Sequence, residues 1–161
     1  MLIRPASHDD WPQIWPFFDD IVRDGRTYAY PDDLDSASAE ALWMESPPGL
    51  TVVAVDDGRV VGSAKMGPNR PGRGAHIATA SFMVNPSAQG RGVGRALGEF
   101  AVDWARTSGF HGMQFNAVVE TNTPAVELWK SLGFDVLATV PEAFQHATAG
   151  LVGMHIMYRK F

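Results

Sequence analysis

The sequence predicts one α/β domain that spans residues 1–161 and is built around a mixed sheet. The 161 residues correspond to one domain, and a composition of 45% hydrophobic and 19% charged residues is typical of a chain that buries a core. In the first half a helix pair and a strand meander are predicted, and in the second half strands and helices alternate. This order of elements is expected of a sheet with both parallel and antiparallel neighbours.

The N-terminal segment predicts a short strand and an amphipathic helix. Leu2 to Arg4 form the strand, and Ser7 is a suitable N-cap residue with Asp10 three positions later, near the positive end of the helix. Pro16 is expected to bend this helix or to delay its start, and Gly25 is expected to end it. The apolar residues recur with the spacing of one buried helical face: Ile14, Phe17, Phe18, Ile21 and Val22.

The next segment predicts an aromatic loop, a second helix and a β-hairpin. Residues 26–31 are aromatic and end in proline, so we expect a loop there, followed by a helix over 36–45. Asp57-Gly58 lies between two runs rich in β-branched residues, 50–55 and 59–65. Because Asp-Gly is favoured in tight turns between antiparallel strands, these two runs are expected to form a hairpin.

The second half of the chain predicts a loop and then an alternation of strands and helices. Residues 67–74 are rich in Gly and Pro and are expected to form the loop. The elements that follow are a strand over 75–84, a helix over 92–107, a strand over 113–119, a helix over 123–132, and strands over 134–140 and 151–159. The helix over 92–107 is strongly amphipathic, so its apolar residues are expected to belong to the core.

Charge and cysteine content disfavour several classes of function. Thirteen Lys and Arg against 18 Asp and Glu give a net charge of −5, which argues against nucleic acids and anionic membrane surfaces as partners. Cysteine is absent, which excludes disulfides, thiolate metal sites and an acyl-cysteine intermediate. No apolar run is long enough to span a bilayer, and residues 1–5 lead into Asp9 and Asp10 instead of a signal peptide, so a cytoplasmic protein is expected.

A glycine-dense turn between a strand and a helix is the segment most informative about chemistry. Gly90, Gly92 and Gly94 remove side chains from this turn, so that backbone N–H groups and the positive helix end can approach an anion such as a phosphate. Arg91 and Arg95 add positive charge in an acidic protein. The turn lacks both the Lys-Ser/Thr pair of a P-loop and the third glycine of the dinucleotide fingerprint. A turn whose glycines only permit tight packing remains the alternative.

Two motifs resemble signatures of the GNAT acetyltransferase superfamily. Gln89-Gly90-Arg91-Gly92-Val93-Gly94 is similar to Gln/Arg-x-x-Gly-x-Gly/Ala, and Asn122 to Phe134 resembles Asn-x-x-Ala-x-x-Leu-aromatic-x-x-x-Gly-Phe. The resemblance is closest over residues 75–134. It implies a mixed central sheet of about six to seven strands with helices on both faces. It also implies that the two central parallel strands, 75–84 and 113–119, separate to admit a thioester.

The resemblance implies acetyl-CoA as the co-substrate and indicates the residues that bind it. The pyrophosphate is expected on the backbone amides of the glycine turn, and the pantetheine is expected along the edge of the strand before it. The residues implied are Phe82, Met83, Val84, Gln89, Gly90, Arg91, Gly92, Val93, Gly94, Arg95 and Asn122. The Val84 N–H is the expected donor to the thioester oxygen, and a homodimer is the expected assembly.

The acceptor is expected to be a small primary or secondary amine, such as an amino acid or an analogue. Trp129 and the segment 115–119 look like the branch of the family that acts on such molecules. Asn116, a polar residue in an apolar strand, is a candidate for binding the acceptor, and Tyr28 and Tyr30 are candidates for the pocket wall. Many family members carry at position 129 a Tyr that can protonate the leaving thiolate, whereas Trp129 is expected to pack or to form a pocket wall.

Direct attack of the amine on acetyl-CoA in a ternary complex needs no metal, but the amine has to lose a proton. Glu120, at the turn from a central strand into a helix, is the first candidate for the catalytic base, His76 is the second, and His155 is weaker. An acceptor that binds as the neutral amine needs no protein base, and this alternative stays open. A non-catalytic CoA-binding module of the same fold is the alternative to an enzyme.

Overall fold

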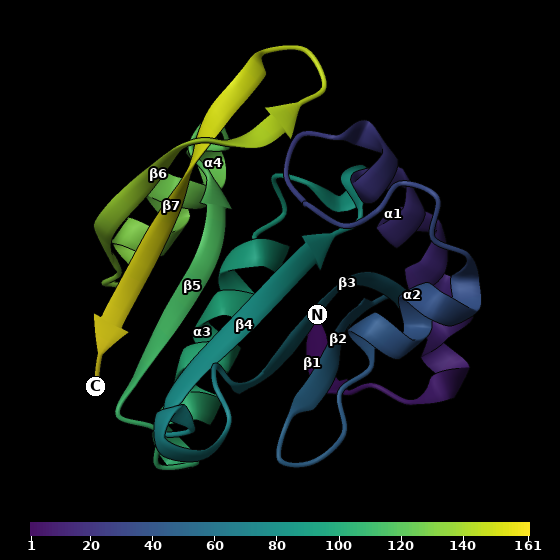
Figure 1. Ribbon diagram of the computed structural model, residues 1–161. Helices are drawn as coiled ribbons and strands as arrows, with labels where there is room; N and C mark the ends of the chain where they lie inside the picture. The colour runs from purple at the N-terminus through teal and green to yellow at the C-terminus, as the bar shows by residue number, and fades with distance from the viewer.

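The computed structural model describes residues 1–161 and contains one seven-stranded sheet with the strand order β1-β2-β3-β4-β5-β7-β6 (Figure 1). All neighbouring strands are antiparallel except β4 and β5, which are parallel, so the sheet is mixed as predicted. The strands are β1 (Leu2–Pro5), β2 (Leu50–Asp56), β3 (Arg59–Pro68), β4 (Ile77–Val84), β5 (Gly112–Val119), β6 (Asp135–His146) and β7 (Gly150–Lys160).

Two helices cover each face of the sheet, which confirms the predicted layers. The helices are α1 (Trp11–Asp24), α2 (Ser36–Trp43), α3 (Val93–Thr107) and α4 (Thr123–Ser131). Successive residues of β2 point to opposite faces: Val53 is buried in a cluster with residues of α1 and α2, whereas Val52 and Ala54 are buried in a cluster with residues of α3 and α4. None of the helices combines the length and the hydrophobicity that crossing a membrane requires.

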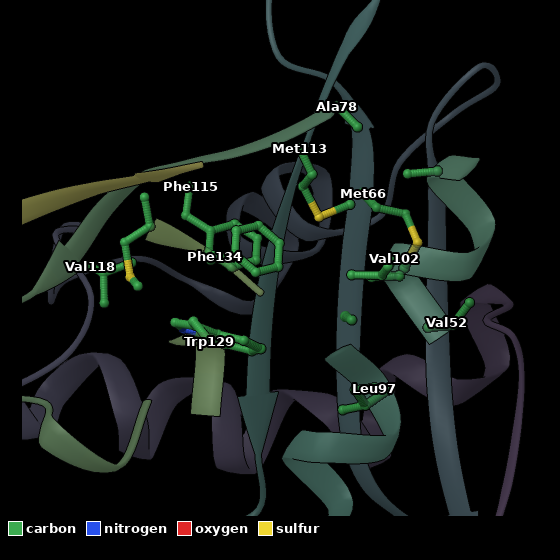
Figure 2. Packing of buried hydrophobic residues seen from close by; sticks show 14 of the residues in the cluster. Val52, Met66, Ala78, Leu97, Val102, Met113, Phe115, Val118, Trp129 and Phe134 are labelled. Carbon is green, nitrogen blue, oxygen red and sulfur yellow. The ribbon is translucent and has the colours of Figure 1, made fainter. Parts of the chain in front are cut away.

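The larger of the two cores lies between the sheet and the helices α3 and α4. It contains 19 buried residues, and Figure 2 shows several of them, including Leu97 of α3, Met113 of β5 and Trp129 of α4. Phe115 stacks on Phe134 with ring centroids 4.3 Å apart. The apolar stripe predicted for the helix over 92–107 is therefore core. The smaller core, of ten buried residues, lies under α1 and α2.

The first helix does not start late at Pro16, which was one of the two effects expected of this proline. A short 3-10 turn (His8–Asp10) with Ser7 at its N-cap leads into α1, which begins before Pro16 and continues through it to Gly25, whose left-handed backbone ends the helix. A proline inside a helix costs about 3 kcal/mol. Each buried apolar side chain contributes about 1.5–3 kcal/mol, and α1 buries five of them: Trp11, Ile14, Phe17, Phe18 and Val22. Burial therefore outweighs the proline.

Three further boundaries differ because of contacts with distant residues. The predicted helix over 36–45 ends at Trp43, since Met44 is extended and the Glu45 N–H donates to Thr51 Oγ1 at 2.9 Å. The predicted strand over 134–140 continues to His146, because β7 pairs with it on both sides of a bulge, up to Gly150. The predicted loop over 67–74 starts two residues later, after Pro68.

An ion pair between Arg4 and Asp10 connects β1 to the start of α1. The Arg4 guanidinium donates to both carboxylate oxygens of Asp10, at 2.7 and 2.8 Å, and the Ser7 N–H donates to Asp10 Oδ2 at 2.8 Å. The Asp10 side chain is buried, while Arg4 is partly exposed. The hydrogen bonds from Arg4, followed by those from Ser7, lower the pKa of Asp10 to about 2 in spite of its burial.

Asp10→Asn is expected to lower the free energy of unfolding at pH 7 by about 1–2 kcal/mol, less than the full pKa shift implies because Arg4 is solvent-screened. A carboxyl whose pKa is lower in the folded state stabilises the fold above its unfolded pKa, near 3.8, and this stabilisation is lost as the pH falls through about 2. Urea unfolding between pH 7 and pH 2 measures it. The difference in the free energy of unfolding between the wild type and Asp10→Asn should shrink between pH 4 and 2. The difference for Asp9→Asn, a change at an exposed neighbour, should not shrink in this range. Parallel profiles would contradict the assignment.

Candidate functional site

The parallel strands β4 and β5 pair only at their first residues and then separate. The paired residues are Ile77 with Gly112 and Ala78 with Met113, and no pairing follows (Figure 1). On its other side β4 stays paired with β3 up to Val84. The separation predicted for these two strands is therefore present, and it leaves one edge of β4 facing an opening.

A groove of about 730 Å³ occupies this opening. Its walls come from β4 (79–84), β5 (115–119), the loop 27–30 and the facing side of α4. Sixteen of the 25 lining residues are hydrophobic, so the groove suits a long, largely uncharged ligand segment. Gln89, Gly90 and Gly94 of the glycine turn line one end, and Asn122, the N-cap of α4, lines the wall nearby.

The backbone groups of Phe82 and Val84 point into the groove. The Asn85 N–H donates to Val61 O across to β3 at 2.9 Å, whereas the Phe82 N–H donates to the Tyr28 hydroxyl on the opposite side. Because N–H and C=O groups alternate sides along a strand, the groups of Val84 face the same side as those of Phe82. Two amides of β4 thus face the groove, and the Tyr28 hydroxyl accepts from one of them, that of Phe82.

The glycine turn forms an open cradle at the start of α3. Gly90 and Gly92 have φ angles of 77° and 78°, a left-handed conformation that side chains disfavour. The Ala96 N–H donates to Gly92 O at 3.0 Å, so the amides of Val93, Gly94 and Arg95 precede the first helical hydrogen bond. No atom lies within 4 Å of a Cβ built at Gly90 or Gly92, which leaves space for an anion beside these amides.

The charged side chains of the turn have partners within the protein. Arg91 forms an ion pair with Asp56, which also lies 3.4 Å from the N-terminal ammonium. Arg95 donates to Ser131 Oγ at 3.0 Å. Val93 is buried in the core. The cradle is therefore formed by backbone groups. The groove lining does not include Arg91, Gly92, Val93 or Arg95.

A second, polar cavity of about 550 Å³ meets the groove. Its charged residues are Glu45, Lys65 and Arg70, with Lys65 Nζ 3.3 Å from Glu45 Oε1. Asn116, which is exposed on β5, donates to Asn69 Oδ1 at 2.7 Å. The residues that line both the groove and this polar cavity are Tyr30, Thr79, Ala80, Ser81 and Asn116. Two ligands, one from each side, would meet at these residues.

Tyr28 and Tyr30 form an aromatic wall at this junction. Their rings stack with centroids 5.3 Å apart, and Tyr30 stacks on Phe18 of α1 at 5.8 Å. Burial raises the pKa of both hydroxyls. Both tyrosines, Asn116 and Trp129, which are the candidates for acceptor binding, line the groove.

Trp129 closes the groove from α4. Its ring lies 4.6 Å from that of Phe82 and 5.0 Å from that of Phe115, and the residue is 7% exposed. The spacing predicted this packed position. Phe82 on β4 and Phe115 on β5 thus meet over the indole, at the point where the two strands have separated.

The candidate bases lie outside both cavities. Glu120 directly follows β5, but its carboxylate accepts from the Gly153 N–H of β7 at 2.6 Å and is turned away from the groove. His76 precedes β4 at the opposite end from the glycine turn, where its ring packs edge-on to His111. His155 Nδ1 lies 2.7 Å from Thr139 Oγ1. The role of Glu120 as a base stays a prediction.

Separated parallel strands, a glycine cradle at a helix start and a groove between them define a site for an extended, anion-bearing ligand such as an acyl-CoA. The sequence profile of the Acetyltransferase (GNAT) family matches residues 15–134. The chain belongs to this family.

Solved structures share the whole fold. A GCN5-related N-acetyltransferase from Kribbella flavida is 58% identical, has a TM-score of 0.97, and matches over 99% of this chain and 97% of its own. The yncA structure from Salmonella typhimurium, which contains acetyl-CoA, is 27% identical with a TM-score of 0.82 and coverage of 99% and 93%.

Curated relatives match at identities of 28% to 36%. The L-amino acid N-acyltransferase MnaT of Escherichia coli is 36% identical over 69% of this chain and 66% of its own length. The L-methionine sulfoximine/L-methionine sulfone acetyltransferase of Pseudomonas aeruginosa is 28% identical over 89% and 85%. The N-acetyltransferase aca1 of Schizosaccharomyces pombe is 33% identical over 60% of this chain, which spans only 46% of that relative's length.

Proposed function

We propose that the protein transfers the acetyl group of acetyl-CoA to a primary or secondary amine of a small molecule, an amino acid or an analogue. The observation that carries this proposal is the junction of the apolar groove with the polar cavity at the open edge of β4. An acyl donor in the groove and an amine in the polar cavity would meet there, at Thr79, Ala80 and Ser81.

The groove and the glycine turn offer contacts to several parts of acetyl-CoA. The glycine cradle offers backbone N–H groups to the pyrophosphate, and the edge of β4 from Val84 to Phe82 offers backbone groups to the pantetheine and the thioester. Asn122, near the cradle, is a further contact for the cofactor. The apolar lining, including Trp129, excludes water from the thioester.

The polar cavity supports a small, charged acceptor. Glu45, Lys65 and Arg70 supply both signs of charge, and Asn116 with Tyr30 sits at the junction. Three relatives are named for acceptors of this kind: the L-amino acid N-acyltransferase of E. coli, the methionine sulfoximine/sulfone acetyltransferase of P. aeruginosa and the L-2,4-diaminobutyric acid acetyltransferase of Nocardia farcinica. An amino-acid-like acceptor fits both observations.

The reaction is direct attack within a ternary complex. The amine nitrogen attacks the thioester carbon, the C–N bond forms, and the carbonyl electrons move to the oxygen, which a β4 N–H stabilises. When the C–S bond breaks, CoA leaves as a thiolate and takes up a proton. The nitrogen of the amide product loses one of the protons that the amine carried. The Glu120 carboxylate is held by the Gly153 N–H, and Glu45 of the polar cavity is not among the residues shared with the groove. Of the two alternatives, a protein base or a neutral amine, we therefore favour an acceptor that binds as the neutral amine and is oriented by Asn116.

The test of the function is release of free thiol from acetyl-CoA during incubation with a panel of amino acids and small amines. Turnover with at least one amine, and the acetylated product in a mass spectrum, is the expected result. A control with N-methylated quaternary acceptors, which cannot form an amide, should release no thiol. Binding of CoA without turnover on any acceptor would favour a non-catalytic CoA-binding module instead.

Glu120→Gln is expected to change kcat by less than about threefold, because the carboxylate is bound to Gly153 outside the groove. Asn116→Ala should mainly raise the KM of the acceptor. Steady-state rates against pH, for two acceptors of different basicity, measure both effects, and the acidic limb should follow the pKa of each amine. A loss of about two orders of magnitude in Glu120→Gln, with intact CoA binding, would make Glu120 the base after all.

A homodimer and a cytoplasmic location are the remaining parts of this proposal. Large apolar side chains are exposed on the β6–β7 side of the molecule, among them Leu137, Val140 and Leu151. Because exposed apolar groups of this kind favour a protein contact, they support an interface between two copies of the chain.

A further inference from the structure

The Tyr28 hydroxyl bonds to both polar groups that Phe82 turns toward the groove. It accepts from the Phe82 N–H at 2.9 Å and donates to the Phe82 C=O at 2.6 Å. In a continuous sheet a neighbouring strand would make these bonds, but β5 has separated from β4 before this level. A side chain from a loop 54 positions away in the sequence thus takes the place of a strand partner.

Several contacts hold Tyr28 in this place. Its ring stacks on Tyr30 and packs edge-on against Trp43, with centroids 6.3 Å apart. The loop that carries it starts at Gly25, whose C=O accepts from the Ala147 N–H of the β6–β7 turn at 2.9 Å. Burial raises the pKa of the Tyr28 hydroxyl, so the group keeps its proton and remains a donor to Phe82.

Phe82 lies where a thioester would end. Thr79, Ala80 and Ser81 line both the groove and the polar cavity, and Phe82 is the next residue toward the glycine turn. A ligand that extends from the turn along β4 therefore reaches Val84 first and Phe82 just before the junction. The Tyr28 oxygen, 2.9 Å from the Phe82 nitrogen, occupies a position in which this N–H holds an oxygen acceptor.

We propose that the Tyr28 hydroxyl is a place-holder for the thioester oxygen: it occupies the Phe82 N–H in the free protein and yields it to the carbonyl of acetyl-CoA. Tyr28 is then a positioning residue, and the donor to the thioester is the amide of Phe82 and not that of Val84. The inference rests on the proposed function, because acetyl-CoA has to bind in the groove. Free CoA has no carbonyl at its sulfur, so it leaves the bond between Tyr28 and Phe82 in place.

Calorimetry with CoA and with acetyl-CoA, in the absence of acceptor, tests the proposal on three proteins. Tyr28→Phe leaves the Phe82 N–H unpaired in the free protein. The carbonyl of acetyl-CoA can then accept from this N–H without displacing a hydroxyl. The preference for acetyl-CoA over CoA should therefore rise about threefold to tenfold relative to the wild type. Tyr30→Phe removes the hydroxyl of the stacked neighbour, which has no bond to Phe82, and should leave this preference unchanged.

Amide resonances of the labelled wild-type protein give a readout that does not depend on the variant folding. The Phe82 amide proton should shift more with acetyl-CoA than with CoA, whereas the Val84 amide should respond equally to both. The proposal would be overturned if Tyr28→Phe left the preference for acetyl-CoA over CoA unchanged or reduced it. It would also be overturned if the Val84 amide resonance, and not that of Phe82, distinguished the two ligands. Absence of binding of either ligand to the wild type would overturn the proposed function together with it.

Discussion

Gly94→Val is expected to weaken CoA binding by about 100-fold while the protein stays folded. A Cβ at Gly94 meets Leu128 Cδ2 at 3.5 Å and Val84 Cγ2 at 3.7 Å, which are ordinary contacts. The Cβ therefore fits the fold, and the branches of valine would occupy the groove, which Gly94 lines beside the first amides of α3. Loss of two charge-assisted hydrogen bonds, at about 1.5–3 kcal/mol each, accounts for an effect of this size or larger. Calorimetry with CoA measures it.

Arg91→Ala is the matched contrast within the same turn. Its guanidinium is exposed and already paired with Asp56, so solvent and the carboxylate screen its charge, and CoA affinity should fall by less than about fivefold. Gly92→Val is a poorer test than Gly94→Val, because the φ of 78° at Gly92 would strain the helix start and confound binding with folding. Equal, small losses in Gly94→Val and Arg91→Ala would leave the glycine turn with a packing role only.

Trp129→Ala is expected to lower the free energy of unfolding by about 3–5 kcal/mol, because it removes a buried indole and leaves a cavity. The ring touches Phe82 and Phe115, and a Cβ at Gly98 of α3 would lie 2.8 Å from Trp129 Cζ3. This one side chain therefore contacts α3 and both separated strands. Denaturant unfolding of the variant and the wild type measures the loss.

Trp129→Phe separates packing from chemistry. A phenyl ring keeps most of the contacts with Phe82 and Phe115 but has no N–H, so turnover should stay close to that of the wild type if Trp129 only packs. The thiol-release rate and the thermal melt of this variant are compared with those of Trp129→Ala. Near-total loss of turnover in a stably folded Trp129→Phe would show that the indole takes part in the reaction.

Elements that depend on neighbours in the chain were predictable from the sequence. The helical spacing from Ile14 to Val22 overrode Pro16 because it buries a continuous apolar face, and Asp57-Gly58 turned as expected, with positive φ at both residues. The glycine turn was recognisable because its conformation requires the absence of side chains at Gly90 and Gly92. Such features are set by the period of the pattern and by the backbone freedom of single residues.

The tertiary structure decided which side chains face the site. Glu120 follows a central strand as predicted, but pairing with β7 places the Gly153 N–H beside it and turns its carboxylate away from the groove. Arg91 lies in the predicted turn, but Asp56 of the distant hairpin holds its guanidinium. In each case the sequence places the residue near the site, and the partner comes from a strand whose position only the sheet order determines.

The contact between Tyr28 and Phe82 is the clearest case of this limit. The sequence shows an aromatic loop and a strand separated by a helix, a hairpin and a Gly- and Pro-rich segment. It carries no signal for their contact, because a hydroxyl bonds to a strand edge only where another strand has left that edge unpaired. The sequence by itself determined the elements, the glycine turn and the core. The divergence of β4 from β5 decided which backbone groups are free, and therefore where a ligand and Tyr28 compete.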